Sequence, residues 1–269
     1  MCDGPGPGVR VSQITGRIPW ICGTLGSPIV TTVLFVRHGR TAANTAGLLA
    51  GWTPGVHLDD TGRAQAAALA ERLRPVPLSA VVTSPLERCQ ETVAALLADR
   101  DGLAPQVDAR VGECHYGDWQ GQELKKLAKD PLWRVVQAHP SAVRFPGDGG
   151  ESLRDSQARG VAAVRDWNAR LGPDATYVVC SHGDLIKSIV ADALGLHLDL
   201  FQRLIVDPCS LTVVQYTELR PFLVRLNDTG GGVDALIPPK RRPRRSRRRR
   251  QDESDAVVGG GAGAPTAGA

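Results

Sequence analysis

A short apolar run that ends in two basic side chains constrains this chain most. Val33-Leu34-Phe35-Val36 is followed at once by Arg37, His38 and Gly39. Continuous Val/Leu/Phe runs are typical of buried parallel strands, and ligands of open α/β sheets bind at the carboxyl ends of such strands. One Arg guanidinium can bind two phosphate oxygens at once, and neutral His can act as a nucleophile at neutral pH. Gly lets the backbone approach a ligand closely. The run therefore predicts a phosphate site that contains a nucleophile.

Composition predicts one domain between two tails. Residues 1–29 are rich in Gly and Pro and lack periodicity, and residues 229–269 are Gly/Pro/Arg-rich and then Ala/Gly-rich. We expect one domain over residues 30–228, a normal size, and a disordered tail over 229–269, which has few large apolar residues to bury. For residues 1–29 we expect disorder or a spurious extension ahead of a start at Val30. Gly, Ser and Pro interrupt the weakly apolar stretch before Val30, so we expect no signal peptide.

The charge is concentrated in the tail. Nine basic residues lie in 240–250 and three acidic residues follow by Asp255, so that segment carries +6 and the rest of the chain, at −2, is near neutral. Two interpretations stay open: a solvated extension, which we favour, or an arm that binds nucleic acid or another anionic surface. No aromatic residue interleaves with the arginines, so stacking on bases is not available.

Cysteine usage predicts a reducing cytoplasm. The six cysteines form no Cys-x-x-Cys pair and show no zinc spacing. Cys180 lies in an apolar run, which favours a buried, reduced thiol. No apolar stretch is long enough to span a membrane.

The middle of the chain alternates strand and helix patterns, which predicts an α/β fold. This alternation gives a three-layer α/β/α sandwich with a mostly parallel central sheet. We expect strands over 31–36, 80–83 and 176–180, with two closing strands over 212–216 and 222–226 at a sheet edge. The expected helical segments are 44–49 (helical or loop), 61–73, 84–98, 122–137 (interrupted near Asp130-Pro131), 151–171 and 185–194. Ser84 is the expected cap of the helix that follows it.

Three strand-to-helix junctions carry the chemistry. Arg37-His38-Gly39 follows the first strand, Ser84 to Arg88 follows the second, and Ser181-His182-Gly183 follows the third. Parallel strands bring these junctions to one end of the sheet, and helix N-termini there favour anions. Two Arg and two His at one point suit a phosphoryl group. His38 and His182 could instead hold a metal ion, but no Asp or Glu stands near them at ligand spacing, so we expect no metal site.

A phosphoryl transfer also needs an acid for the leaving oxygen. Glu113 stands out, just before the turn-like Tyr116-Gly117-Asp118. A carboxyl group there could protonate the leaving group and then activate water. From the residues alone a surface carboxylate remains the alternative.

At these residues the sequence resembles the histidine phosphatase superfamily, also called the phosphoglycerate mutase-like superfamily. The resemblance covers about residues 31–227 and rests on five motifs in order. They are Arg37-His38-Gly39 with Thr41 and Asn44, the segment 84–92 (Ser-Pro-Leu-Glu-Arg-Cys-Gln-Glu-Thr), the segment 113–121 (Glu-Cys-His-Tyr-Gly-Asp-Trp-Gln-Gly), the segment 146–152 (Pro-Gly-Asp-Gly-Gly-Glu-Ser), and Ser181-His182-Gly183.

The resemblance implies a role for each matched residue and a phosphoglycerate mutase-like fold. His38 is implied to become phosphorylated and Glu113 to donate the proton. Arg37, Asn44, Arg88 and His182 are implied to hold the phosphoryl oxygens, and Thr41, Gly51 and Gly183 to contact substrate. No metal or other cofactor is implied.

The resemblance also selects a branch. The segment between Glu113 and His182 is short, whereas cofactor-dependent phosphoglycerate mutases carry a longer insertion there. The chain therefore looks closest to the actinobacterial branch of phosphomutases and broad-specificity phosphatases. Gln120 stands where family members often have Glu.

We expect a phosphomonoester hydrolase for a small phosphorylated metabolite, with the segment 120–151 as lid. Three questions stay open. The first is whether the chain is a phosphomutase, which would use the same residues. The second is whether it is a catalytically idle protein that binds a phosphate ligand or nucleic acid. The third is whether it forms a homodimer.

Overall fold

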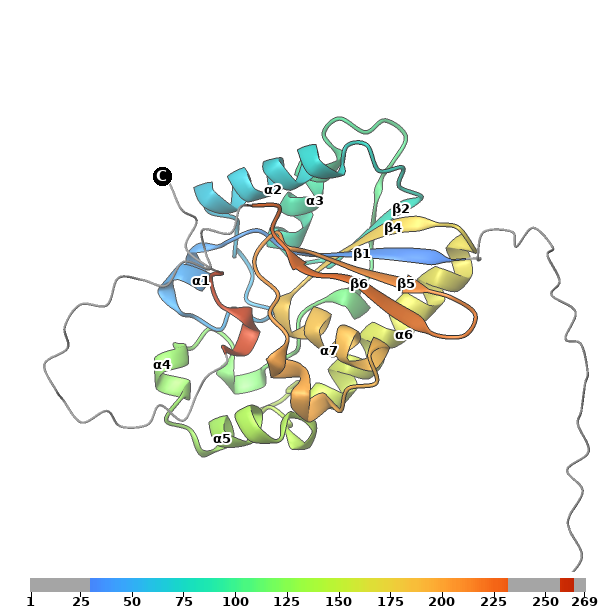
Figure 1. Cartoon of the computed structure of the whole chain (residues 1–269). Coiled ribbons are helices and arrows are strands. Elements are labelled where there is room, and N and C mark those ends of the chain that lie inside the picture. The colour runs from blue at the N-terminus through green and yellow to red at the C-terminus, as the bar shows by residue number, and fades with distance from the viewer. Residues whose placement is uncertain (1–29, 232–256, 264–269) are drawn as a thin grey trace, which may run out of the picture.

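A computed structural model of the chain describes residues 30–231 and 257–263. One six-stranded mixed sheet lies between two helical layers, as the α/β/α prediction requires (Figure 1). The strand order is β3-β2-β4-β1-β5-β6; β1 to β4 run parallel, while β5 is antiparallel to β1 and β6 to β5. The strands are β1 (Thr31–Arg37), β2 (Ala80–Thr83), β3 (Pro105–Val107), β4 (Thr176–Ser181), β5 (Leu211–Tyr216) and β6 (Pro221–Asp228).

The central strand β1 is buried on both faces, which explains its continuous apolar run. Side chains alternate across a strand, so Val33 and Phe35 join one apolar cluster while Leu34 and Val36 join the other. Each cluster fills the space between one face of the sheet and the helical layer that covers it.

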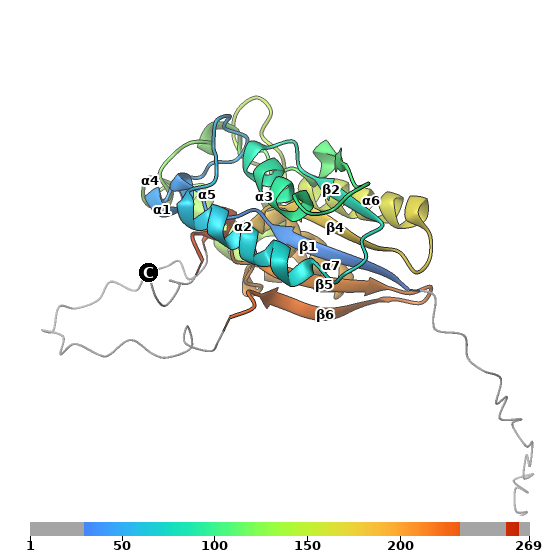
Figure 2. The same cartoon turned by 90° about the horizontal axis from the view of Figure 1, so that it is seen from above.

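The two helical layers contain a pair of long helices each (Figure 2). The helices α2 (Asp60–Leu73) and α3 (Glu87–Leu97) pack on the Leu34 face, and α6 (Leu153–Leu171) and α7 (Gly183–Ala193) on the Val33 face. Shorter helices are α1 (Ala42–Ala46), α4 (Leu124–Leu127) and α5 (Pro131–Ala138).

Local capping explains where the helices differ from the predicted ranges. The helix predicted over 44–49 lies earlier, because Thr41 caps α1 in a capping box with Asn44 and Gly47, at φ +68°, ends it. The stretch 122–137 forms two helices, because Asp130 caps α5 with Pro131 at its first position. The strand β3 was not predicted, since its three residues are exposed and only pairing with β2 defines them.

Residues 257–263 lie within the tail 229–269 for which we expect disorder, and they are the part of it, with 229–231, that the structure describes. Val258 is 2% exposed and belongs to the same apolar cluster as Leu49 and Tyr116. The expectations for residues 1–29 and for the basic run 240–250 fall outside the described residues, as does the rest of the tail.

The predicted burial of Cys180 is confirmed. The four cysteines in the described part of the chain are buried and free: Cys89, Cys114, Cys180 and Cys209. Within residues 30–231 and 257–263, no helix has the length and apolar character to cross a bilayer.

Candidate active site

The carboxyl ends of β1, β2 and β4 lie side by side, as predicted. The register pairs Arg37 with Ser181 and Thr83 with Cys180. Consequently the residues that follow these strands share one end of the sheet, and the rings of His38 and His182 are 5.2 Å apart between centroids.

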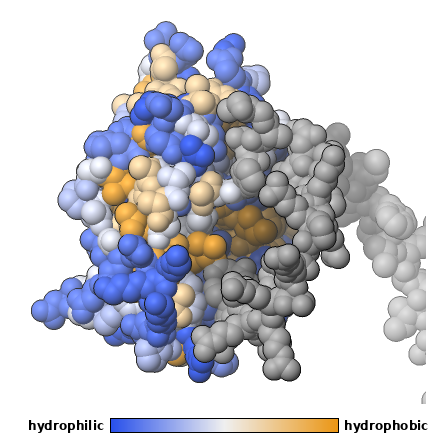
Figure 3. Space-filling view, turned by 90° about the vertical axis from the view of Figure 1, so that its left-hand side faces the viewer, coloured by the Kyte–Doolittle hydropathy of each residue, from blue (hydrophilic) through white to orange (hydrophobic). Residues whose placement is uncertain are grey.

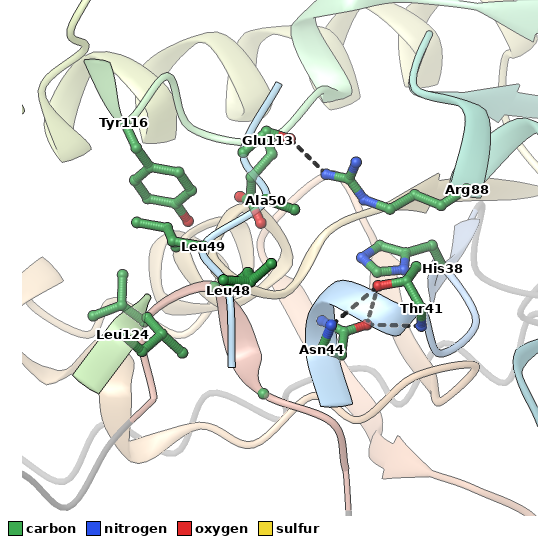
Figure 4. Close-up of a pocket in the computed structure, with 14 residues that line it drawn as sticks. His38, Thr41, Asn44, Leu48, Leu49, Ala50, Arg88, Glu113, Tyr116 and Leu124 are labelled. Atoms are coloured by element: carbon green, nitrogen blue, oxygen red, sulfur yellow. Dashed lines mark hydrogen bonds between the residues drawn. The ribbon is translucent and has the colours of Figure 1, made fainter. Parts of the chain in front are cut away.

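One pocket at this end of the sheet gathers most of the predicted residues. The pocket has a polar side, which includes His38 and Arg88, and an apolar side (Figure 4). Figure 3 shows the face that forms the left-hand side of Figure 1, where apolar surface gathers near the centre. Six predicted residues line the pocket: His38, Thr41, Asn44, Gly51, Arg88 and Glu113. Sequence reasoning missed the apolar walls, which it had no polar signal to find: Leu48, Leu49, Tyr116, Leu124 and Val258.

The neutral form of His38 is held in one tautomer. Its Nδ1 lies 2.7 Å from the carbonyl oxygen of Gly39, which can only accept, so Nδ1 carries the proton and Nε2 keeps its lone pair. Burial, with the charges of Arg88 and Arg37 adding to it, holds the pKa of His38 well below its usual 6.5. The neutral imidazole can therefore act as a nucleophile through Nε2 at neutral pH.

His182 is fixed by Arg88 on one side and Ser84 on the other. Arg88 Nη2 donates to His182 Nδ1 at 3.2 Å, so Nε2 carries the proton and donates to Ser84 Oγ at 2.8 Å. Burial and Arg88 keep the pKa of His182 well below its usual value. The prediction that Ser84 caps the next helix is wrong, because α3 begins with Leu86 at its cap position and without a side-chain cap.

Arg88 lines the pocket and has hydrogen-bond donors that no described residue accepts. It is 2% exposed, and its Nη2 also donates to the carbonyl oxygen of Gly51 at 2.7 Å. Its Nε and Nη1 are buried and find no partner among the described residues. Buried donors without acceptors are costly, so this group is arranged to receive an anion.

Glu113 is buried beside this cationic cluster. It is 3% exposed, and Oε1 accepts from the N–H of Cys114 at 3.0 Å. Burial first, and the charge of Asp184 second, raise the pKa of Glu113 to about 7. The carboxyl group can therefore give and take a proton near neutral pH. The alternative of a surface carboxylate is wrong.

Asp184 is a buried acid to which the sequence reasoning gave no role. It is 2% exposed, accepts from the hydroxyl of Tyr116 at 2.9 Å and lies 3.7 Å from the ammonium of Lys187. The only available signal was its position directly after Ser181-His182-Gly183.

Thr41 and Asn44 lock each other at the pocket edge. The N–H and Oγ1 of Thr41 both lie within 3.0 Å of Asn44 Oδ1, so the amide nitrogen of Asn44 is its remaining donor (Figure 4). Gly51 turns with φ +51°, and its missing side chain leaves room for Gln120.

Arg37 and Gly183 adjoin the pocket rather than line it. Arg37 is fully buried, and its guanidinium donates to the carbonyl oxygens of Val206, Gly260 and Gly261. Gly183 begins α7, and a Cβ there would lie 3.1 Å from Gly260 Cα. Among the described residues, no group of three or more His, Cys, Asp or Glu side chains is placed to hold a metal ion.

Residues 33–229 match the model of the histidine phosphatase superfamily, branch 1. The chain belongs to this superfamily. The match spans the sheet and all the predicted site residues.

Similar proteins include both phosphatases and mutases. A glucosyl-3-phosphoglycerate phosphatase of Mycolicibacterium vanbaalenii is 36% identical over 178 residues, which cover 63% of this chain and 77% of the relative. A 2,3-bisphosphoglycerate-dependent phosphoglycerate mutase of Gloeobacter violaceus is 28% identical over 183 residues, covering 66% and 82%.

A solved structure supports the phosphoglycerate mutase-like fold. The mycobacterial glucosyl-3-phosphoglycerate phosphatase in complex with VO3 superposes with a TM-score of 0.64 at 30% identity, and the match covers 73% of this chain and 98% of that one.

Proposed function

We propose that this chain is a metal-independent phosphomonoester hydrolase that acts on a small phosphorylated metabolite through a phosphohistidine at His38. The observation that carries the proposal is the pairing, in one pocket, of a neutral His38 with a buried Glu113 whose pKa is about 7. Vanadate is an oxyanion related to phosphate, and the mycobacterial phosphatase complex with VO3 supports a phosphoryl ligand here.

The first step transfers the phosphoryl group to His38. The lone pair on Nε2 attacks phosphorus, and the bond from phosphorus to the ester oxygen breaks. Glu113 gives its proton to that leaving oxygen. Arg88 donates from Nε and Nη1, and Arg37 from Nε, since these buried donors have no other partner among the described residues. Further donation to the phosphoryl oxygens requires the Arg37 Nη groups to leave the carbonyl oxygens of residues 260 and 261, and His182 Nε2–H to leave Ser84 Oγ.

The second step releases phosphate. Glu113, now a carboxylate, takes a proton from a water molecule whose oxygen attacks phosphorus. The bond from phosphorus to Nε2 breaks, and His38 and Glu113 return to their starting states. The Asn44 amide is a further donor to the phosphoryl group, and Thr41, Gly51 and Gly183 contact the rest of the substrate.

A panel of phosphoesters in EDTA tests the reaction type. The panel contains glucosyl-3-phosphoglycerate, 3-phosphoglycerate and phosphoserine, and released phosphate and isomer formation are followed together. Phosphate release supports the hydrolase, whereas isomer formation without release replaces it with a phosphomutase. No turnover of any compound favours the idle binding protein.

Trapping the intermediate tests the nucleophile. After a quench, the wild type should carry acid-labile, alkali-stable phosphate, and His38→Ala should carry none and lose turnover. His197→Ala is the matched control. The side chain of His197 is 63% exposed, and it caps the short helical turn over residues 198–203. Labelling that persists in His38→Ala would refute the assignment.

A further inference from the structure

Residues 257–263 form part of the wall of the pocket that contains His38 and Glu113. Figure 1 shows this segment, in red, between α1 and α7. Val258 is buried among the apolar walls, and the N–H of Gly259 donates to Asp184 Oδ2 at 2.8 Å. Val258, Gly259 and Gly261 all line the pocket that holds His38 and Glu113.

Backbone carbonyl oxygens of the segment accept hydrogen bonds from both Nη groups of Arg37, while its Nε finds no partner among the described residues. The Nη2 of Arg37 donates to Gly261 O at 2.6 Å and to Gly259 O at 3.3 Å, and Nη1 donates to Gly260 O. These three oxygens carry partial negative charge and surround the guanidinium as phosphoryl oxygens would.

Only glycine fits this approach. Gly259, Gly260 and Gly261 have φ of +74°, +79° and +55°, a region that side chains disfavour. A Cβ on Gly260 would also lie 3.1 Å from Arg37 Cζ. The run of three glycines is thus matched to close packing on Arg37.

The segment takes space and hydrogen-bond donors that a phosphoryl group bound by Arg37 would need. With the segment in place, the space open to the centre of a water molecule is about 20 Å³, little more than one water needs. A phosphoryl group bound by Arg37 would also have to replace the three carbonyl oxygens as acceptors.

We propose that the segment 257–263 is an intramolecular inhibitor that competes with phosphoryl ligands for Arg37. This inference rests on the proposed function for the identity of the ligand. Because the segment belongs to the same chain, it competes at an effective concentration of about millimolar. The apparent affinity for ligand is then lowered by the fraction of molecules whose site is open.

Binding of inorganic phosphate to the full-length protein, measured by calorimetry in EDTA, tests the proposal. Val258→Asp places a charge in the apolar wall and should release the segment. Because burial of one Val side chain changes an equilibrium by about tenfold or more, the segment should detach in most molecules, and the dissociation constant for phosphate should then fall by the ratio of all molecules to open ones, about fivefold. Val257→Asp is the matched control, because Val257 is 47% exposed, and it should bind phosphate as the wild type does.

A second variant, Gly260→Val, keeps the test valid if Val258→Asp does not fold. It forces a side chain against Arg37 and should also tighten phosphate binding. Unchanged or weaker phosphate binding in both Val258→Asp and Gly260→Val would overturn the proposal, and weaker binding would make the segment part of the competent site.

A peptide with the sequence of residues 252–269, added to Val258→Asp, gives an independent readout. It should weaken phosphate binding competitively, and no competition at millimolar peptide would contradict the proposal. These are binding measurements, so tighter phosphate binding without turnover on the panel would defeat only the proposed function.

Discussion

Replacement of Glu113 by Gln tests the acid–base step, because Gln keeps the shape of the side chain and removes its proton. The Gln carbonyl can still accept from the N–H of Cys114, as Glu113 Oε1 does at 3.0 Å. Any loss of rate therefore reports the missing proton rather than a collapsed pocket.

The expected loss depends on the leaving group. A positioned general acid contributes about 10²–10⁴-fold, which is about 3–5 kcal/mol of barrier. Since burial and Asp184 raise the pKa of Glu113 to about 7, roughly nine-tenths of the free enzyme carries this proton at pH 6. An alkyl phosphate should show the full loss there. p-Nitrophenyl phosphate should lose less than about tenfold, because its anion leaves without a proton.

The assay compares kcat/KM for both esters at pH 6 in the wild type, Glu113→Gln and Glu218→Gln. Glu218 is exposed in the turn between β5 and β6, so its variant should match the wild type. Equal losses on the two esters in Glu113→Gln would show that Glu113 is not the acid, and the proposed mechanism would need another proton donor.

Two further predictions concern Asp184 and Gly62. Asp184→Asn removes a negative charge that helps to raise the pKa of Glu113, so that pKa should fall and the alkaline limb of kcat/KM should move to lower pH. A limb that stays in place or moves upward in a pH–rate profile would contradict this coupling. Gly62→Ala should lower the free energy of unfolding by about 1–3 kcal/mol, because its Cβ would lie 2.0 Å from the carbonyl oxygen of Arg40. Gly231→Ala, with nothing within 4 Å of its Cβ, is the control in urea unfolding, and equal midpoints for the two would refute the steric argument.

The strand ends could be predicted because their signals are local. The run Val33 to Val36 is apolar throughout since both faces of β1 are buried, and Arg37 and His38 follow it directly. Parallel pairing then decides which junctions meet, and the β1–β4 register fulfils that expectation. The proposed role of Glu113 rested on the family motif, because its burial arises from contacts distant in sequence and has no local signal.

The parts that escaped prediction depend on long-range contacts. The strand β3 exists through its pairing with β2, and its exposed residues have no alternating pattern. Ser84 fits a capping pattern, yet its hydroxyl accepts a hydrogen bond from His182, which is 98 positions away in the sequence. Nothing in the local sequence around Gly260 indicates that Arg37 lies beside it.

The Gly-rich segment shows how a composition that argues against structure can still give an ordered contact. Fixing the backbone of residues 257–263 costs about 7–14 kcal/mol, at about 1–2 kcal/mol for each residue. Burial of Val258, the three carbonyl contacts of Arg37 and the Gly259–Asp184 hydrogen bond together contribute a similar amount, about 8–15 kcal/mol. Because the two quantities nearly cancel, a ligand that takes Arg37 from the segment shifts the equilibrium, as a reversible inhibitor requires. A segment richer in large apolar residues would bind more permanently, and one without Val258 would not bind.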